Sequence, residues 1–372
     1  MTELTGNHTR RIGLIFGGQS TEHEVSIQSA KNIAAAIDPL STSVSLLYVT
    51  KQGKWFLLPE GTLLAQATIS DIPDFTHGAT PITIIPGGGY YCLMDLDKKE
   101  IACKLDVAFP IIHGNGGEDG SLQGLLHIAN LPYVGPDYLG SAIAMDKEIS
   151  KRLMMSAGLS VAQYVLVRRH EIDNLDLASI IEKLGLPIFV KPARQGSSVG
   201  VSKVHDATEL RRAIEVAAQY GTKVLLEEAV IGREIECSVI GNEHPEASIP
   251  GEVIVTGDEF YSYDAKYVSS TAARTLIPAS LSKDQIAAVQ TVALQAFKAL
   301  DCEGMARVDM FINPQGGIYV NEINTLPGFT AISMYPKMWE ASGICYRELI
   351  NRLISLALAR SERDRSFSQF SG

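Results

Sequence analysis

The start of the chain constrains the fold most, because a short apolar run leads through two glycines into a helical pattern. The run Ile12-Gly-Leu-Ile-Phe16 has the length and character of a strand buried on both faces, and Gly17-Gly18 ends it. Apolar residues then recur at helical spacing from about Val25 to Ile37, and residues 44–49 predict a second strand. This order predicts an open α/β sheet whose ligands lie at the carboxyl ends of its strands.

The α/β pattern continues along the chain, and the C-terminal part predicts α+β structure. Its 372 residues exceed what one core usually holds, so two or three domains are expected, with a boundary near Pro132–Pro136. Further strands are predicted at 106–112, 188–192, 199–204, 223–227, 234–240, 252–255, 306–312 and 318–323. Further helices are predicted at 145–157, 207–220, 283–300 and 341–359, and the polar tail after Arg360 is expected to fray.

The last two predicted strands form a candidate hairpin with acidic side chains. Their connection is the turn Asn313-Pro-Gln-Gly-Gly317. Because alternate residues of a strand share a face, Asp309 points with Arg307, and Glu322 points with Asn324. Pairing of the strands would let Asp309 face Glu322, and such hard oxygen ligands suit Mg²⁺. Taken alone, an Asp–Glu pair on a hairpin is more often part of a solvent-facing, salt-bridged surface.

A lysine at the end of an apolar strand indicates a phosphate-binding loop. Lys191 ends the predicted strand 188–192, and the loop Ala193-Arg-Gln-Gly-Ser-Ser198 follows. Small residues of this kind present backbone N–H groups and hydroxyls to phosphate oxygens, here from Ser197 and Ser198. Lys147 is a second candidate cation, for which a solvated lysine in a first helical turn is equally plausible. The loop does not match the P-loop pattern G-x-x-x-x-G-K-[ST].

Acidic residues near the next strand are candidates for contacts with a nucleotide. The run Leu225-Leu-Glu-Glu-Ala-Val230 passes from an apolar strand toward Gly232 and Glu234. Glu227 could accept a hydrogen bond from the amino group of adenine, and Glu234 could hold ribose hydroxyls. By themselves such glutamates are more often solvated.

Two polar loops at strand ends are candidates for the binding of a small amino acid. Gly17–Ser26 opens the first helix and contains Glu22, although Ser20 or Thr21 could be a plain helix N-cap. His113-Gly-Asn-Gly-Gly-Glu-Asp-Gly-Ser121 places a histidine among glycines and two acids, which favours a site over a structural role. An amino acid needs an acid for its ammonium, here Glu22, and donors for its carboxylate. The candidate donors are Arg307 and Ser333.

Composition excludes several classes of protein. A net charge of −10 opposes binding to DNA or RNA, and no segment has the roughly 20 apolar residues of a membrane helix. The polar start and short apolar run behind it predict no signal peptide. The five scattered cysteines, without a CxxC pair, predict reduced thiols in a cytosolic protein. Neither glycine-containing loop is G-x-G-x-x-G, so a dinucleotide-dependent oxidoreductase is disfavoured.

Taken in order, the motifs resemble those of the D-alanine–D-alanine ligases, a family of the ATP-grasp superfamily. They span about Ile12 to Leu358. The motifs are Gly17-Gly-Gln-Ser-Thr-Glu-His-Glu-Val-Ser26, His113-Gly-Asn-Gly-Gly-Glu-Asp-Gly120, Met145-Asp-Lys147, Lys191-Pro-Ala-Arg-Gln-Gly-Ser-Ser-Val-Gly200, Tyr263-Asp-Ala-Lys-Tyr267, Ala306-Arg-Val-Asp309 and Asn321-Glu-Ile-Asn-Thr-Leu-Pro-Gly328. The resemblance implies three domains: an N-terminal open parallel sheet in residues 1–137, and ATP-grasp domains in 138–227 and 228–372.

The resemblance also implies a set of site residues. Those implied to bind ATP are Lys147, Lys191, Ser198, Glu227, Val230, Glu234 and Lys266. Those implied to hold two Mg²⁺ ions, which Mn²⁺ can replace, are Asp309, Glu322 and Asn324. Those implied to bind two D-alanine molecules are Glu22, His113, Arg307, Gly328, Ser333 and Met334. Those implied to take part in catalysis are Glu22, Ser197, Tyr267, Arg307, Lys266 and Gly328.

The family roles assign some of these residues to the two D-alanine molecules and others to the tetrahedral intermediate and the γ-phosphate. Glu22, close to His113, binds the ammonium of the first D-alanine, and Ser333 with the Met334 backbone binds the carboxylate of the second. Arg307 and the Gly328 backbone stabilise the tetrahedral intermediate. The same resemblance implies that Lys266 lies on a loop that closes over the γ-phosphate of ATP. It also implies that Tyr267 links this loop to Glu22 through Ser197.

The implied activity is ATP-dependent formation of D-alanyl-D-alanine through an acyl phosphate, with release of ADP and phosphate. It would serve peptidoglycan precursor synthesis in a cytoplasmic homodimer. Two features depart from the family pattern. Residues 268–276 lack the acidic residues expected after Tyr267, and Glu228 stands where relatives can carry a basic or amide side chain.

Two other functions are weighed against this one. A D-alanine–D-lactate ligase would carry another residue, often histidine, at the position of Tyr267, so the dipeptide is favoured. A non-catalytic ATP-grasp metabolite sensor could lose Arg307 or a metal ligand, and this chain has both.

Overall fold

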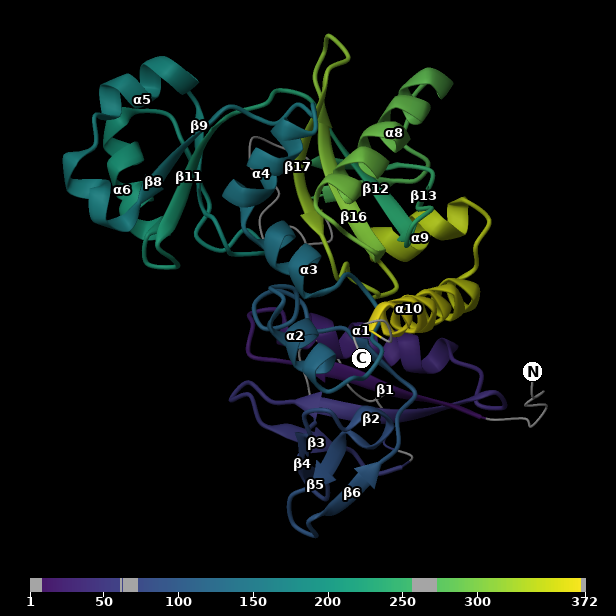
Figure 1. Ribbon diagram of the computed structural model, residues 1–372. Coiled ribbons are helices and arrows are strands. Elements are labelled where there is room, and N and C mark those ends of the chain that lie inside the picture. Colours follow the sequence, from purple (N-terminus) through teal and green to yellow (C-terminus); the bar gives the residue numbers. More distant parts are fainter. Residues whose placement is uncertain (1–8, 61, 63–72, 256–272, 369–372) are drawn as a thin grey trace. The chain divides into compact units, whose positions relative to one another are not determined.

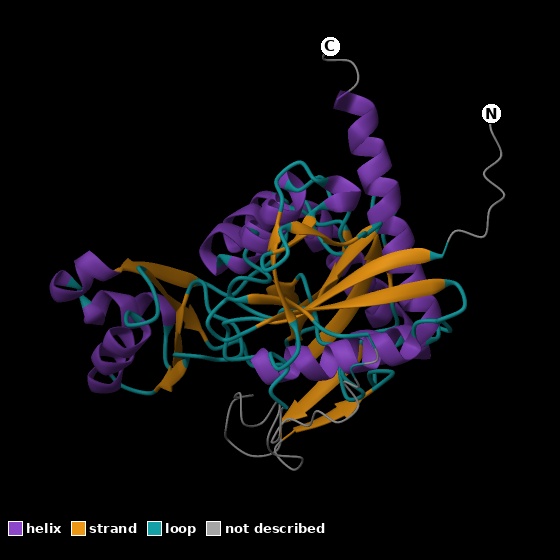
Figure 2. Ribbon diagram, turned by 90° about the horizontal axis from the view of Figure 1, so that it is seen from below, coloured by secondary structure: helices purple, strands orange, loops and turns teal. Residues whose placement is uncertain are grey.

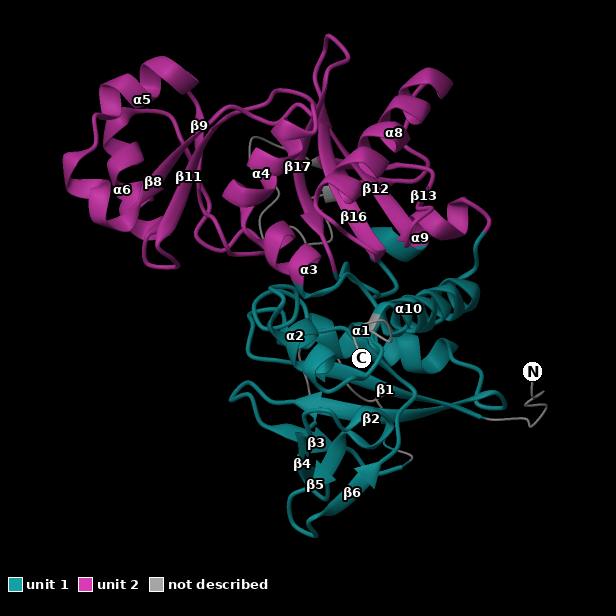
Figure 3. Ribbon diagram, in the orientation of Figure 1, with its two compact units in different colours: residues 1–138, 326–336, 344–372 teal, residues 139–325, 337–343 magenta. Residues whose placement is uncertain are grey.

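The computed structural model describes residues 9–60, 62, 73–255 and 273–368 (Figure 1). Lys266 and Tyr267, with the motif 263–267, lie outside the described residues. The chain forms two compact units (Figure 3). Unit 1 consists of residues 1–138, 326–336 and 344–372, and unit 2 of residues 139–325 and 337–343.

Unit 1 contains a seven-stranded sheet in the order β6-β5-β4-β3-β2-β1-β7. Its strands are β1 (Arg10–Gly17), β2 (Thr42–Val49), β3 (Trp55–Leu57), β4 (Thr80–Ile84), β5 (Leu93–Asp95), β6 (Glu100–Cys103) and β7 (Val107–Pro110). Only β1 pairs in parallel, with β2 and with β7, and the other neighbours are antiparallel. The expected open parallel sheet was therefore wrong for β3 to β6. In the described parts of the chain, only a 3₁₀ turn at Gly89–Tyr91 lies between these strands, and a direct connection between neighbours reverses the chain.

The helices of unit 1 come from both ends of the chain. They are α1 (His23–Ala36), α2 (Ser121–Ile128) and α10 (Tyr346–Ser368), with a 3₁₀ turn η2 at Gly89–Tyr91. α10 packs against α1 and β7, which explains why the end of the chain belongs to this unit rather than to the unit that carries the C-terminal strands. Its Arg360 is buried and donates to the carbonyl oxygens of Tyr133 and Gly135, at 2.8 and 2.6 Å.

The final helical segment differs from its prediction. Instead of one helix over 341–359, α9 (Met334–Ala341) ends before Gly343, whose φ of 92° is in the left-handed region, and α10 follows. The tail after Arg360 is also not frayed as expected, because α10 continues to Ser368, as Figure 2 shows. Among the described residues, no helix is long and apolar enough to cross a membrane.

Unit 2 contains two sheets with separate cores. The four-stranded sheet has the order β10-β9-β11-β8, all antiparallel. Its strands are β8 (Tyr164–Arg168), β9 (Ile188–Pro192), β10 (Ser202–Val204) and β11 (Lys223–Glu228). Its helical elements are η3 (Arg169–Asn174), α5 (Leu177–Leu184) and α6 (Ala207–Ala217), and apolar residues of both helices pack with Val190 and Leu226 in one core.

The second sheet of unit 2 has the order β15-β14-β12-β16-β17, with β13 paired to β12. Its strands are β12 (Arg233–Gly241), β13 (Glu246–Ala247), β14 (Gly251–Val255), β15 (Ala273–Leu276), β16 (Gly304–Ile312) and β17 (Ile318–Asn324). α8 (Lys283–Ala299) begins with a capping box made by Ser282 and Gln285, and it packs against one face of this sheet. α3 (Tyr138–Met145) and α4 (Lys147–Ser156) precede the two sheets in the chain.

Candidate active site

Unit 2 contains a cavity of about 260 Å³ with an apolar part and a charged part. The apolar lining residues are Ala162, Phe189, Val201, Val230, Phe311, Tyr319 and Val320. The charged and polar ones are Lys147, Lys191, Gln195, Ser197, Ser198, Glu227, Glu228, Glu234, Asp309, Asn321 and Glu322, and Gly196 completes the lining. Apolar walls with a few polar groups are typical of a site for a small molecule, and lysines suit an anionic one.

The hairpin of β16 and β17 supplies the acidic part of this cavity. Asp309 lies opposite Glu322, as the sequence predicted, and Arg307 lies opposite Asn324. The register shifts after Asp309, so that Met310 lies opposite Val320. Val308 and Met310 belong to the core that α8 covers, so the alternate residues of β16 face away from α8. The periodicity of the strands thus directs the carboxylates toward the cavity.

Arg307 and Asn324 bind the buried carboxylate of Asp309 on several sides. Arg307 donates from Nε to Oδ1 and from Nη2 to Oδ2, both at 2.7 Å, and Asn324 Nδ2 donates to Oδ2 at 2.9 Å. Arg307 Nε also lies 3.0 Å from Oε2 of Glu236, which lies opposite Asp309 on β12. Glu236 was not predicted as a site residue, although it lies two residues after Glu234 and therefore on the same face of the strand.

The residues predicted as metal ligands fit Mg²⁺ in their chemistry. Asp309, Glu322 and Asn324 offer only oxygen donors on one face of the hairpin. Among the described residues, no three His, Cys, Asp or Glu side chains are grouped so that they could hold a metal ion. Two carboxylates and an amide leave positions for phosphate oxygens and water, which is the usual arrangement for Mg²⁺ beside a nucleotide.

Both predicted phosphate-binding lysines line the cavity. Lys147 Nζ lies 3.2 Å from Oε2 of Glu322 and donates to the carbonyl oxygen of Gln195 at 2.8 Å. Lys191 Nζ lies 2.7 Å from Oε2 of Glu227 and 3.4 Å from Oδ1 of Asn321. The structure thus brings both cations to the edge of the acidic hairpin.

The loop between β9 and β10 also lines the cavity with its small residues. Ser197 and Ser198 have φ angles of 49° and 59°, in the region that L-residues rarely adopt. Consecutive residues of this kind hold a loop in a tight curve, and such strain is typical of ligand-binding segments. The cavity-lining position of both serines agrees with the sequence-based expectation of a phosphate loop.

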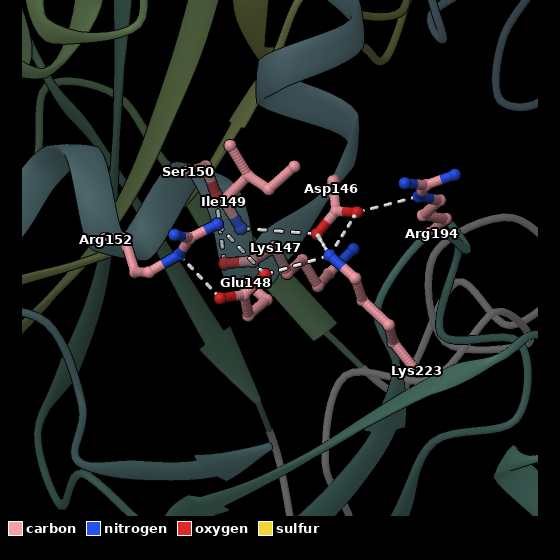
Figure 4. Close-up of polar contacts among 8 residues, drawn as sticks. All are labelled: Asp146, Lys147, Glu148, Ile149, Ser150, Arg152, Arg194 and Lys223. Carbon is pink, nitrogen blue, oxygen red and sulfur yellow. Dashed lines mark hydrogen bonds and ion pairs between the residues drawn. The ribbon is translucent and has the colours of Figure 1, made fainter. Parts of the chain in front are cut away.

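A network of ion pairs connects this loop to α4 (Figure 4). Asp146 caps α4 by accepting from the N–H of Ile149, and its Oδ2 accepts from Nε of Arg194 at 2.7 Å and from Nζ of Lys223 at 3.0 Å. Burial opposes its ionisation, but Arg194 and Lys223 lower the pKa of Asp146. Lys223 Nζ also donates to Glu148 at 2.8 Å. Asp146 therefore holds together the start of α4, where Lys147 lies, and the start of the loop.

We expect Asp146→Asn to raise the KM for ATP about tenfold, with a smaller change in kcat. Asparagine caps a helix as well as aspartate does, so the helix stays intact while the charge that holds Arg194 and Lys223 is lost. Steady-state kinetics with varied ATP measure this. Asp176→Asn is the matched control, because Asp176 caps α5 through the N–H of Ser179 and does not line the cavity. An unchanged KM in Asp146→Asn would contradict the positioning role.

Glu227 has two lysine partners at the end of β11. Besides Lys191, the ammonium of Lys151 lies 3.2 Å from its Oε1. Lys151 is fully buried, at 0% exposed, and Glu227 is 4% exposed. Burial opposes ionisation of Glu227, yet Lys151 and Lys191 together lower its pKa. Lys151 was not predicted as a site residue, although it lies four residues after Lys147 and therefore on the same face of α4.

The other predicted nucleotide residues line the cavity as well. Val230 and Glu234 do so, the latter near the start of β12. Glu228, for which the sequence analysis assigned no role, accepts from the N–H of Gln163 at 2.8 Å.

The predicted substrate loops of unit 1 are joined by buried hydrogen bonds. Ser20 Oγ donates to the carbonyl oxygen of His113 at 2.6 Å and accepts from the N–H of Glu22. A Cβ at Gly114 would lie 3.1 Å from Oε2 of Glu22, and the φ of 72° at this residue is in the left-handed region that favours glycine. The N-cap of α1 is Glu22, whose side chain makes no capping hydrogen bond, so neither Ser20 nor Thr21 is the N-cap.

His113 connects these loops to the segment after β17. Its Nδ1 lies 2.8 Å from the carbonyl oxygen of Leu326, and its Nε2 lies 3.0 Å from Oγ of Ser29. Burial disfavours the imidazolium, but the carboxylates of Glu118 and Glu22 raise the pKa of His113. Ser29 Oγ also accepts from the N–H of Phe329 at 3.2 Å. Burial raises the pKa of Glu118 as well, so His113 and the two acids form one interacting group, and a site with both basic and acidic groups suits a zwitterion.

The remaining predicted substrate residues lie in the same segment. A Cβ at Gly328 would lie 2.6 Å from Oγ of Ser333, which accepts from the N–H of Thr330 at 3.0 Å. Met334 is buried at the start of α9. Glycine at 328 therefore allows a close approach of the Ser333 hydroxyl to the backbone. Unit 1 thus carries Glu22, His113, Gly328, Ser333 and Met334, and unit 2 carries the nucleotide and metal candidates.

Comparisons with known proteins identify the family. Residues 11–136 match the family model described as D-ala D-ala ligase N-terminus, and residues 153–355 match D-ala D-ala ligase C-terminus. The chain is 51% identical over 359 residues to D-alanine–D-alanine ligase A of Chromobacterium violaceum, covering 96% of this chain and 98% of the relative. It is 48% identical over 354 residues to D-alanine–D-alanine ligase A of Escherichia coli strain K12, covering 95% and 97%.

Solved structures agree as well. A D-alanine–D-alanine ligase from Coxiella burnetii superposes with a TM-score of 0.86 at 36% identity, covering 97% of each chain. A D-Ala:D-Ser ligase from Enterococcus faecalis superposes with a TM-score of 0.84 at 34% identity, covering 94% of this chain and 100% of that one. The architecture is thus the ATP-grasp fold that the motifs predicted, and the chain is a ligase that belongs to the D-alanine–D-alanine ligase family.

Proposed function

We propose that this ligase joins two D-alanine molecules to D-alanyl-D-alanine, with ATP converting the first carboxylate to an acyl phosphate. One observation carries the nucleotide part: a single cavity of unit 2 combines apolar walls, two lysines, a loop of small residues and an acidic hairpin. The names of the relatives support D-alanine as substrate. ADP and phosphate are the other products, and the dipeptide serves peptidoglycan precursor synthesis.

Different residues of the cavity bind different parts of the nucleotide. Glu227 and the backbone at Val230 form hydrogen bonds with adenine beside the apolar walls, and Glu234 binds ribose. Lys147 and Lys191 hold the phosphates, with Ser198 and the loop backbone around them. These lysines offset the negative charge that phosphates bring into a protein of net charge −10. We also propose, from the family resemblance, that Lys266 contacts the γ-phosphate.

Asp309, Glu322 and Asn324 would hold two Mg²⁺ ions, or Mn²⁺ in their place. Bound there, the metal neutralises charge on the transferred phosphoryl group. In the structure Asp309 is bound by Arg307 and Asn324, and Glu322 by Lys147. These cations and the amide keep the carboxylates in place for the metal.

The roles at the amino-acid end are proposed from the family resemblance. A carboxylate does not react with an amine near neutral pH, whereas an acyl phosphate does. Glu22, near His113, binds the ammonium of the first D-alanine, and Ser333 with the Met334 backbone binds the carboxylate of the second. Arg307 and the Gly328 N–H stabilise the negative charge that forms when the second amine attacks. Ser197 and Tyr267 are proposed to exclude water by closing the site.

The domain division, the oligomeric state and the compartment are proposed from the family pattern. We propose three domains, 1–137, 138–227 and 228–372, in which the two sheets of unit 2 belong to the second and third. The enzyme would act as a cytoplasmic homodimer, and free cysteines such as buried Cys92, Cys237 and Cys302 fit a reducing compartment.

Product analysis tests the proposal. The protein with ATP and MgCl₂ is expected to release phosphate only when D-alanine is added, and to yield D-alanyl-D-alanine. Parallel reactions contain D-alanine with D-serine or with D-lactate, because one structural relative is a D-Ala:D-Ser ligase. A mixed dipeptide or an ester as the main product would replace the proposed second substrate.

The same assay separates an enzyme from a metabolite sensor on an ATP-grasp scaffold. A folded protein that binds ADP but releases no phosphate with any of these acceptors would support the sensor. Calorimetric titration with ADP shows whether the nucleotide site itself is present.

A further inference from the structure

Lys151 is a buried charge that the proposed reaction does not use. Its side chain is 0% exposed, and it does not line the cavity. Within the described residues its Nζ makes no well-formed hydrogen bond, and it is paired with Oε1 of Glu227 at 3.2 Å. Taking an ammonium and a carboxylate out of water costs several kcal/mol each, and a buried pair often adds no net stability. Stability alone therefore explains Lys151 poorly.

The two lysines around Glu227 are not equivalent. Lys191 lines the cavity and also contacts Asn321, so a bound nucleotide competes for its ammonium. Lys151 lies one turn after Lys147 on α4, contacts the other carboxylate oxygen of Glu227, and is fully buried outside the cavity lining. Lys151 is therefore the lysine that stays paired with Glu227 when Lys191 contacts the phosphate or the base of a bound nucleotide.

The charge of Glu227 decides which base the cavity accepts. An ionised carboxylate only accepts hydrogen bonds, whereas a protonated carboxyl can also donate one. The amino group at C6 of adenine is a donor and satisfies an anion. The oxygen at C6 of hypoxanthine is an acceptor, and against an anion in a buried site it leaves both groups unpaired or repelling.

We propose that Lys151 is a positioning residue that keeps Glu227 an anionic acceptor and thereby makes the cavity select a purine with an amino group at C6. This rests on the proposed nucleotide site. Burial lowers the pKa of Lys151, and the carboxylate of Glu227 opposes that shift in favour of the ammonium. The pair thus fixes the charge of the group that reads the base.

Calorimetric titration with ADP and IDP, both with MgCl₂ and without D-alanine, tests the proposal. We expect the unaltered protein to bind ADP at least about tenfold more tightly than IDP. In Lys151→Met and Lys151→Gln this preference should fall by about tenfold, mostly through weaker ADP binding. Lys151→Gln is one atom shorter but keeps a hydrogen-bond donor, and it serves as the second variant if the methionine variant does not fold.

Lys223→Met is the matched control. Lys223 is also a largely buried lysine bound to carboxylates of unit 2, but it contacts Asp146 and Glu148 instead of Glu227. Lys223→Met should weaken the binding of ADP and the binding of IDP by the same factor. The proposal would be overturned if the Lys151 variants bound ADP and IDP more weakly by the same factor. It would also be overturned if the unaltered protein bound both nucleotides equally tightly. A protein that binds neither nucleotide would instead refute the nucleotide site.

Discussion

Asp309→Asn is expected to lower kcat about 1000-fold, which corresponds to roughly 4 kcal/mol of transition-state stabilisation. Asp309 offers a buried carboxylate to the proposed metal, and its two oxygens also accept from Arg307. Asparagine has the same shape but lacks the charge, and its NH₂ group would face a guanidinium donor. D-alanine-dependent phosphate release measured over a range of MgCl₂ concentrations should show both a lower maximum and a higher half-saturating concentration.

Glu252→Gln is the control for this experiment. Glu252 lies on β14 of the same sheet and binds Arg233 through two contacts of 2.7 and 2.6 Å, but it does not line the cavity. Breaking that pair should leave kcat and the Mg²⁺ dependence as they were. If Asp309→Asn retained nearly full kcat at saturating MgCl₂, Asp309 would not be a metal ligand.

Arg360→Met should lower the free energy of unfolding by about 3 kcal/mol. The Arg360 guanidinium donates to two backbone carbonyls and lies over the ring of Tyr133, with 4.7 Å from Cζ to the centroid. Methionine keeps much of the packing but leaves the carbonyl oxygens of Tyr133 and Gly135 without this donor. Urea unfolding followed by circular dichroism measures the change.

Arg352→Met, on the same helix, provides the comparison. Arg352 makes an exposed ion pair with Glu348 one turn away, and such pairs contribute little, typically less than about 0.5 kcal/mol. The two variants remove the same kind of side chain from α10. Equal unfolding midpoints for both would mean that the buried contacts of Arg360 do not hold α10 in unit 1.

Much of the site followed from local sequence patterns. Strand alternation placed Asp309 with Arg307 and Glu322 with Asn324, and the turn after Ile312 predicted their pairing, which the structure confirms. The end of an apolar strand located Lys191 and its loop beside the cavity. These predictions succeeded because a strand has a fixed period and a short turn leaves few registers.

Other elements could not be predicted in this way. The chain after β2 was expected to continue an α/β pattern, but β3 to β6 form an antiparallel meander, which depends on how short strands find partners. The last helix was placed across Gly343, because apolar spacing continues through the break between α9 and α10. Lys151 gave no signal as a site residue, since a lysine on an amphipathic helix is normally solvated.

The sequence by itself determined which residues share a face of a strand or helix, and the order of its motifs indicated the family. Only the tertiary structure decided which charges meet. Lys191 and Asn321 are 130 positions apart, and Asp146 and Lys223 are 77 apart. The local periods of strands and helices extend over a few residues, so they cannot specify such pairs. The burial that makes Lys151 and Glu227 interact strongly also exists only after the sheets of unit 2 have packed.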